Sequence, residues 1–245
     1  MTLRVAGKLV WFFGQIVVDV ADYFFRTAWV SKDSKRAARA AWLQRGARRS
    51  LKIFNFRAEV SGPVPTSGLI VSNHLSYLDI LVLSSITPAV FVSKADVRHW
   101  PVFGWLAVLG GTVFIERERR MHVGVVNREI ENALTAGVSV VVFPEGTSSD
   151  GKTILPFRSS LLEPVIGGSQ TITASWIHYT LGDGDAGQEV CYWGDHSFFS
   201  HLLNLLDKQK IRARVCFGKI ERTTDDRKEL AKELQAAVEK LKAEN

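Results

Sequence analysis

The 245-residue chain contains only two cysteines, Cys191 and Cys216, and both lie in short apolar runs, EVCYW and ARVCFG. Neither has the spacing of a metal ligand, and free cysteine is among the most buried residue types. We therefore expect two reduced core thiols in a reducing compartment, on the cytosolic side. The six histidines form no H-E-x-x-H or comparable cluster, so the sequence predicts no metal site.

The chain also lacks an N-terminal apolar run long enough for a confident bilayer span. Its apolar block, Leu9 to Val18, contains one polar side chain, Gln15, and the charged residues Asp19, Asp22 and Arg26 follow at once. A transmembrane helix needs about 20 predominantly apolar residues. No small-residue cleavage site follows the block, so we expect this segment to stay in the mature protein and not to act as a signal peptide.

Acidic residues are scarce between positions 31 and 57, where nine lysines and arginines accompany only Asp33. The whole chain has a formal net charge of +6, which favours an acidic partner, and its 46% hydrophobic content excludes disorder. An apolar, aromatic segment followed by a cationic helix suits an element lying in the headgroup layer of a membrane. We therefore expect residues 1–52 to bind membrane lipids, peripherally or monotopically, on the cytoplasmic face of the cytoplasmic membrane.

Two other interpretations of this N-terminal region are open. It also fits a core helix beside a solvated basic face. Nucleic acid is a third possible partner, but no recognised nucleic-acid module accompanies the basic run, and we expect none to bind. The oligomeric state is not set by any pattern in the sequence.

Beyond residue 53, short apolar runs alternate with helical patterns, without a repeat, a low-complexity segment or a linker. The alternation predicts an α/β fold with helices on a mixed, largely parallel sheet. We expect two parts, an amphipathic helical extension with the basic patch at 1–53 and one catalytic-sized domain at 54–245. Strands are predicted at 57–61, 68–73, 89–93, 112–116, 138–143, 171–178, 189–193 and 213–219. Helices are predicted at 77–86, 101–109, 121–136, 158–167, 197–208 and 225–243.

The stretch NHLSYLD, residues 73–79, joins a predicted strand to a predicted helix. Ser76 can cap the helix, and Asp79 can return a hydrogen bond to the serine backbone, as in a capping box. His74 stands just outside the helix, so Asp79 can accept the proton on one ring nitrogen and leave the other nitrogen as a base. We therefore predict that His74 and Asp79 form a catalytic pair.

A nucleophile belonging to the enzyme is missing from the sequence. There is no G-x-S-x-G elbow, and residues 167–171, GGSQT, do not fit one. A histidine and aspartate pair without such a nucleophile activates a hydroxyl or thiol of the substrate. The predicted chemistry is therefore direct transfer onto a bound alcohol.

Three further positions follow predicted strands, where α/β sheets usually bind ligands. Arg117 can make a bidentate contact to a phosphate, and Lys94 can add positive charge near it. At Glu145, Gly146 and Thr147, a turn lets backbone N–H groups and the threonine hydroxyl converge on a ligand, including a developing oxyanion. From the residues alone, a solvated charge cluster at Arg117 and an ordinary turn at 145–147 are the favoured interpretations, and a plain surface lysine at Lys94 is equally open.

Together these residues resemble the glycerolipid acyltransferase family, which includes the 1-acylglycerol-3-phosphate O-acyltransferases. His74 and Asp79 match its H-x-x-x-x-D motif. GTVFIER at 111–117 is similar to its second block, and FPEGT at 143–147 to its third. The similarity runs from about Phe54 to Phe217, with the blocks in the family's order and spacing.

The resemblance implies transfer of a fatty acyl group from a thioester, on coenzyme A or acyl carrier protein, to the free hydroxyl of a lysophospholipid. The first expectation is 1-acylglycerol-3-phosphate, which gives phosphatidic acid. His74 is then the general base, and Asp79 orients its ring. Neither a metal nor a cofactor is implied beyond the acyl donor, and the implied acceptor-binding residues are Arg117, Glu145, Gly146 and Thr147.

Two departures from the family pattern bear on the acceptor. Ser148 follows Thr147 where the family often has arginine, and the fourth block, residues 173–177, has no proline. A phosphate-free acceptor, such as a lyso-ornithine or lyso-glycine lipid, is therefore the alternative. A non-catalytic lipid-binding protein and a thioesterase are alternatives from other functional classes.

Overall fold

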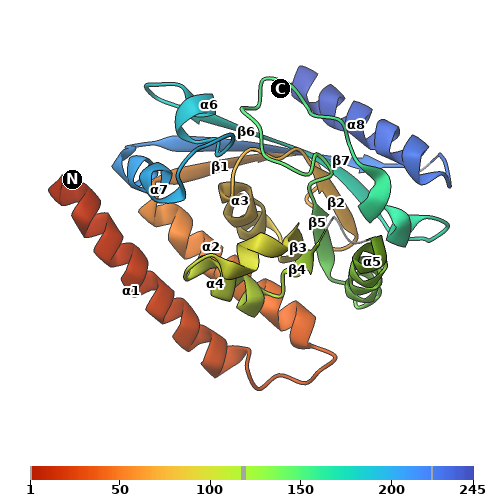
Figure 1. Ribbon diagram of the computed structural model, residues 1–245, viewed down its shortest axis with the longest axis horizontal. Coiled ribbons are helices and arrows are strands. Elements are labelled where there is room, and N and C mark those ends of the chain that lie inside the picture. Colours follow the sequence, from red (N-terminus) through yellow and green to blue (C-terminus); the bar gives the residue numbers. More distant parts are fainter. Residues whose placement is uncertain (1, 117–119, 222) are drawn as a thin grey trace.

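The computed structural model describes residues 2–116, 120–221 and 223–245. Within these residues, seven strands form one sheet in the order β1-β7-β6-β2-β5-β3-β4 (Figure 1). Neighbouring strands pair in parallel, except that β6 and β7 are antiparallel. The predicted mixed, largely parallel sheet is confirmed. The strands are β1 (Phe56–Ser61), β2 (Leu69–Ser72), β3 (Ala89–Lys94), β4 (Val113–Ile115), β5 (Ser139–Val142), β6 (Ile172–Leu181) and β7 (Ile211–Ile220).

Helices cover both faces of this sheet, which makes a three-layer α/β arrangement (Figure 1). The helices α1, α2, α3 and α7 contribute to the core on one face, and α5 and α8 to the core on the other. The helices are α1 (Leu3–Arg26), α2 (Lys35–Ile53), α3 (Leu78–Ile86), α4 (Phe103–Gly110), α5 (Arg120–Thr135), α6 (Ala186–Glu189), α7 (Phe198–Asp207) and α8 (Arg227–Ala243), with 3-10 turns η1 (Ala95–His99), η2 (Ser159–Leu161) and η3 (Glu163–Val165).

The central strands are apolar because both of their faces are covered. In β2, Ile70 packs into the core beneath α3, whereas Leu69 and Val71 pack into the core beneath α5. Every residue of β2 and of β5 is buried. Successive side chains of a strand point to opposite faces, so a continuous apolar run is the pattern expected for a strand between two helical layers.

The N-terminal helices α1 and α2 form a hairpin held by buried charge. Asp19 of α1 is buried, accepts a hydrogen bond from Gln15, and pairs with Arg49 of α2. Burial raises the pKa of the Asp19 carboxyl, and the Arg49 guanidinium opposes that rise. Arg45 of α2 pairs with Asp22 of α1 at 2.9 Å. Part of the basic stretch therefore fixes α1 against α2.

The opposite side of α1 exposes large apolar side chains. Val17 is 69% exposed, Phe25 is 85% exposed, and Trp29 beyond the helix is 87% exposed. Figure 1 shows α1 lying along the outside of the α/β body, next to α2. Among the described residues, no helix is both long enough and apolar enough to span a bilayer. The exposed apolar set on this helix is Leu3, Val10, Trp11, Phe13, Val17, Val18, Phe24 and Phe25.

Two predicted elements are wrong. Residues 189–193 form no strand, because α6 ends at Glu189 and the amides of Val190 and Cys191 both donate to the Ala186 carbonyl at 2.9 Å. These apolar residues are buried as part of a loop that packs into the core. Residues 158–167 form the short turns η2 and η3 instead of one helix, since Pro164 has no N–H to continue helical hydrogen bonding.

Candidate active site

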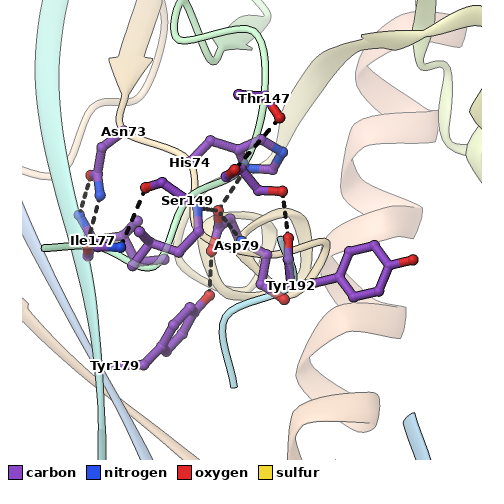
Figure 2. Close-up of polar contacts among 12 residues, drawn as sticks. Asn73, His74, Asp79, Thr147, Ser149, Ile177, Tyr179 and Tyr192 are labelled. Atoms are coloured by element: carbon purple, nitrogen blue, oxygen red, sulfur yellow. Dashed lines mark hydrogen bonds and ion pairs between the residues drawn. The ribbon is translucent and has the colours of Figure 1, made fainter. Parts of the chain in front are cut away.

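The candidate site begins at the carboxyl end of β2, where the chain turns into α3. Asn73 extends the pairing of β2 with β6 beyond its last backbone register at Ser72. Its side-chain amide donates to the Ile177 carbonyl at 3.0 Å, and its side-chain oxygen accepts from the Ile177 N–H at 2.8 Å (Figure 2). Because both groups are buried, this double hydrogen bond fixes the backbone immediately before His74.

The Asp79 carboxylate is fully buried and receives four hydrogen bonds. Its Oδ2 accepts from His74 Nδ1 at 2.7 Å, from the Leu75 N–H at 2.7 Å and from the Ser76 N–H at 3.0 Å. The Tyr179 hydroxyl, on β6, donates to Oδ1 (Figure 2). Hydrogen bonds from backbone and hydroxyl donors stabilise a charged carboxylate.

The predicted pairing of His74 with Asp79 is confirmed by this geometry, but the predicted capping box is only half formed. Asp79 does accept the Ser76 N–H. The Ser76 hydroxyl, however, is buried without a hydrogen-bond partner among the described residues, and the N-cap position of α3 is Tyr77, whose side chain makes no capping hydrogen bond. The Asp79 N–H, which the serine hydroxyl of a capping box would accept, donates instead to the Ser76 carbonyl at 3.0 Å.

The His74 ring is fixed on one side and open on the other. Its Nδ1–H donates to Asp79, and its plane stacks on the Phe143 ring with centroids 4.2 Å apart. No described group bonds to Nε2, and the side chain remains 22% exposed. An imidazole that donates through Nδ1 to a carboxylate presents Nε2 as an acceptor. This arrangement suits a general base that acts on a hydroxyl entering from the open side.

The turn FPEGT lies directly after β5 and against His74. The Ser149 N–H donates to the His74 carbonyl at 3.0 Å, which ties the two turns together (Figure 2). Gly146 has φ +76°, a conformation that favours glycine, and its N–H donates to the Phe143 carbonyl at 3.1 Å. The Gly146 N–H is therefore used within the turn, and the prediction that backbone N–H groups around Glu145 to Thr147 bind a developing oxyanion stays a prediction. Thr147 is exposed at the tip.

Glu145 is buried, with 3% of its surface exposed. Burial is the main cause that raises the pKa of its carboxyl to about 8, and the negative charge of Asp79 adds to the rise. The backbone N–H groups of His74 and Leu155 lie close enough to oppose that rise, but neither makes a hydrogen bond of normal geometry to the carboxylate. Glu145 therefore favours the protonated form near neutral pH.

The two remaining predicted binding residues do not join this cluster in the described structure. Lys94 is exposed at the carboxyl end of β3, and no hydrogen bond or ion pair links its ammonium group to another described residue. Arg117 lies outside the described residues. Their predicted roles therefore stay predictions.

A loop that sequence reasoning missed closes the site from the other side. The Tyr192 N–H donates to the Leu75 carbonyl at 2.8 Å, and the Ser148 hydroxyl donates to the Tyr192 carbonyl (Figure 2). Nearby, the Tyr77 hydroxyl lies 3.0 Å from His201 Nδ1. Burial lowers the pKa of His201 to about 4, so this ring is neutral at neutral pH. From the sequence, the aromatic residues of YWGDHSFF at 192–199 could have indicated that this loop packs against the protein.

An apolar cavity of about 150 Å³ lies between the N-terminal hairpin and the helices α3, α4 and α7. Tyr77 lines the cavity, so the cavity lies next to the turn that carries Asp79. Two aromatic residues, Phe12 of α1 and Phe103 of α4, line its walls. Leu106 of α4 lines it too. The cavity lining is predominantly apolar, which is the chemistry that a hydrocarbon group requires.

The described residues contain no group of three or more histidine, cysteine, aspartate or glutamate side chains placed to hold a metal ion. Both cysteines are free and buried, as predicted, although Cys191 lies in a loop and not in a strand. The chemistry available at the site is thus that of a paired histidine, two buried carboxyl groups and a narrow apolar cavity.

A family model described as Acyltransferase matches residues 55–177, a segment that includes β2, the His74 turn and FPEGT. A lyso-ornithine lipid O-acyltransferase of Brucella abortus is 36% identical over 206 residues, covering 78% of this chain and 77% of that protein. The chain belongs to the acyltransferase family. This acyltransferase is also 31% identical over 156 residues to a 1-acyl-sn-glycerol-3-phosphate acyltransferase of Neisseria gonorrhoeae, covering 59% of this chain and 61% of that protein.

A solved structure supports the fold. The crystal structure of the 1-acyl-sn-glycerophosphate (LPA) acyltransferase from Thermotoga maritima superposes with a TM-score of 0.64 and covers 97% of both chains, at 17% sequence identity. The acyltransferase described here therefore shares the fold of that protein over nearly its whole length.

Proposed function

We propose that this acyltransferase moves a fatty acyl group from a thioester to the free hydroxyl of a lysolipid. The observation that carries the proposal is the His74 imidazole, held by Asp79 through Nδ1 and open at Nε2. A base held in this way activates a hydroxyl of the substrate, and the sequence offers no G-x-S-x-G nucleophile that would take the acyl group first.

In the proposed reaction, Nε2 takes the proton from the acceptor hydroxyl as its oxygen attacks the thioester carbonyl. The Asp79 carboxylate stabilises the imidazolium that forms. When the tetrahedral intermediate collapses, the carbon–sulfur bond breaks and the imidazolium returns its proton to the departing thiolate. General base catalysis of this kind contributes roughly 100- to 10,000-fold to the rate. Neither a metal nor a further cofactor takes part in these steps.

The acceptor that we propose first is a lyso-ornithine lipid. Four relatives named lyso-ornithine lipid O-acyltransferase are 33–37% identical to this chain. In three of them the aligned region covers 70% or more of the relative's own length. Ser148 in place of arginine after FPEGT points the same way. This reverses the order expected from the sequence motifs alone, which put 1-acylglycerol-3-phosphate first.

The second acceptor candidate is 1-acylglycerol-3-phosphate itself, favoured by the similarity to two Neisseria enzymes named for that substrate. Glu145, Gly146 and Thr147, with Arg117 and Lys94, are the residues we propose for acceptor binding. The acyl chain of the donor, acyl-coenzyme A or acyl carrier protein, is proposed to enter the apolar cavity lined by Phe12 and Phe103.

Mass spectrometry of reaction products tests these proposals. The purified enzyme is incubated with each thioester donor in turn and with a panel of acceptors: lyso-ornithine lipid, lyso-glycine lipid and lysophosphatidic acid. The His74→Ala variant is assayed in parallel. We expect diacylated ornithine lipid from the wild type and none from the variant. Release of free fatty acid without a diacyl product would instead indicate a thioesterase. Binding that survives in His74→Ala without any turnover by the wild type would indicate a lipid-binding protein.

We also propose that α1 attaches the enzyme to the cytoplasmic face of the membrane, with its exposed apolar row in the headgroup layer. Residues 1–52 cannot be removed cleanly to test this, since Phe12 and Leu51 belong to the main core. The better test replaces Trp11, Phe25 and Trp29 by serine, with Val60→Ser on β1 as a control for an exposed apolar residue elsewhere. We expect only the triple variant to lose sedimentation with anionic liposomes.

A further inference from the structure

A second cavity, of about 620 Å³, opens beside the FPEGT turn and takes no part in the steps above. Phe143, Pro144 and Gly146 form one wall of it. The Phe143 ring also stacks on His74, so the cavity and the proposed base share a side chain. A ligand group in this cavity is therefore separated from the His74 ring by one side chain, that of Phe143.

The charged side chains that line this cavity are cationic. Arg158 and Arg227 line it, and no carboxylate does so among the described residues. Arg227 is already paired with Glu163 at 3.2 Å, on the outside of the protein. Arg158 has no ion pair or side-chain hydrogen bond with any residue that the structure describes. One guanidinium is thus left available to an anion.

The backbone that carries Arg158 is fixed at several points. The Arg158 N–H donates to the Pro144 carbonyl at 3.0 Å, which ties it to the FPEGT turn. On one side, the Phe157 N–H donates to the Gln235 side chain of α8 at 3.1 Å. On the other, the Asn127 amide of α5 donates to the Ser160 carbonyl at 3.2 Å. The guanidinium therefore extends from a preorganised loop, which lowers the entropic cost of binding a ligand.

We propose that this cavity binds the anionic headgroup of the acceptor lipid and that the Arg158 guanidinium is its main contact. The inference rests on the proposed function and names the headgroup chemistry of that site. The anion is a carboxylate in a lyso-ornithine lipid, whose amino acid is joined through nitrogen, and a phosphate in 1-acylglycerol-3-phosphate. A planar guanidinium binds either oxyanion in a bidentate manner. The third possible source of an anion is the phosphate-bearing acyl donor.

The test compares Arg158→Gln with the wild type on matched acceptors. Lyso-ornithine lipid is paired with its methyl ester, and 1-acylglycerol-3-phosphate with 1-monoacylglycerol. Loss of a charged hydrogen bond predicts that the KM for the charged lipid which the wild type uses rises about 10- to 100-fold, with kcat changed little. The KM values of the neutral lipid and of the acyl donor should stay the same. Arg158→Lys should recover part of the loss.

Arg227→Gln is the matched control, because it removes the same charge from the same cavity while its guanidinium is engaged by Glu163. Its effect on KM should be small. An equal effect of the two variants, an equal loss with neutral lipids, or a rise confined to the donor KM would each overturn the proposal.

Calorimetric titration of the same four lipids, without any acyl donor, separates this inference from the proposed function. If the wild type transfers no acyl group but Arg158→Gln weakens binding of the charged lipids alone, the headgroup site stands and the proposed reaction fails. If transfer occurs and the variant binds charged and neutral lipids as the wild type does, the reaction stands and the site fails.

Discussion

Two buried carboxyl groups stand on adjacent turns of this enzyme, and their surroundings differ in one respect. Asp79, after β2, accepts four hydrogen bonds, one of them from the base His74. Glu145, after β5, has no hydrogen-bond partner of normal geometry among the described residues. Hydrogen-bond donors compensate for lost hydration at Asp79 but not at Glu145, whose carboxyl therefore favours the protonated form.

The largest expected effect comes from Asp79→Asn. The asparagine side chain has only one accepting oxygen. Its NH2 group would therefore face some of the groups that now donate to Asp79, and the charge beside His74 would be removed. We expect turnover to fall by about 100-fold or more. Steady-state kinetics of product formation, with circular dichroism to check folding, measure it. Near-normal turnover by a folded variant would show that Asp79 has no role beyond structure.

Tyr179→Phe should have an intermediate effect, since it removes the donor to Asp79 Oδ1 and leaves the other three hydrogen bonds in place. An unsatisfied buried acceptor costs about 1–3 kcal/mol of unfolding free energy. With a less stabilised carboxylate, we expect the acid limb of the kcat/KM profile to move to higher pH. Tyr192→Phe is the control, because that residue contacts the site through its backbone. A stability loss with an unchanged pH profile would limit Tyr179 to a structural role.

Glu145→Gln is expected to change turnover at pH 7 by less than about threefold if a protonated Glu145 is the active form. Its effect on stability depends on pH. The pKa of Glu145 is raised to about 8 from an ordinary 4.5, so the folded state holds this proton more tightly than the unfolded state. The wild type should therefore lose stability as pH rises from 4.5 to 8, by about 5 kcal/mol at most. Thermal melts across that range should show a flatter dependence in the variant, and parallel curves would refute the assignment.

The smallest effect is expected for Ser76→Ala. A capping serine contributes about 0.5–2 kcal/mol, so its removal would destabilise a capped helix. Here the hydroxyl is buried without a partner, and its loss should leave the melting temperature unchanged or slightly raised. A clear destabilisation, measured by thermal melts against the wild type, would restore the capping box as the correct description.

The sequence predicted the parts of the fold that depend on local patterns. Continuous apolar runs identified β2 and β5, since both faces of those strands are covered. The same criterion failed at residues 189–193, because an apolar run can be buried in a loop without pairing to a strand. The helical pattern at 158–167 gave a second wrong prediction, because Pro164 interrupts the hydrogen bonding of a helix there.

The active site, like the fold, could be predicted only where it depends on local sequence. His74 and Asp79 are five residues apart at one junction, so their pairing depends only on the local turn. Tyr179 is separated from Asp79 by 100 residues, and only the pairing of β6 beside β2 brings its hydroxyl to the carboxylate. A tyrosine near the end of an apolar strand looks like an ordinary core residue. Glu145 was predicted to bind substrate, but no spacing rule indicated that its carboxyl would be buried and protonated.

The hydroxyl of Tyr179 also limits how this enzyme can be divided. The segment that carries the family motifs ends at residue 177, yet the fourth donor to Asp79 lies two positions later and the Tyr192 amide bonds to Leu75. A polypeptide cut at that boundary would contain every recognisable motif, but its Asp79 carboxylate would lack one of the four hydrogen-bond donors. The full set of four donors to Asp79 can therefore form only after β6 has been synthesised and has paired with β2.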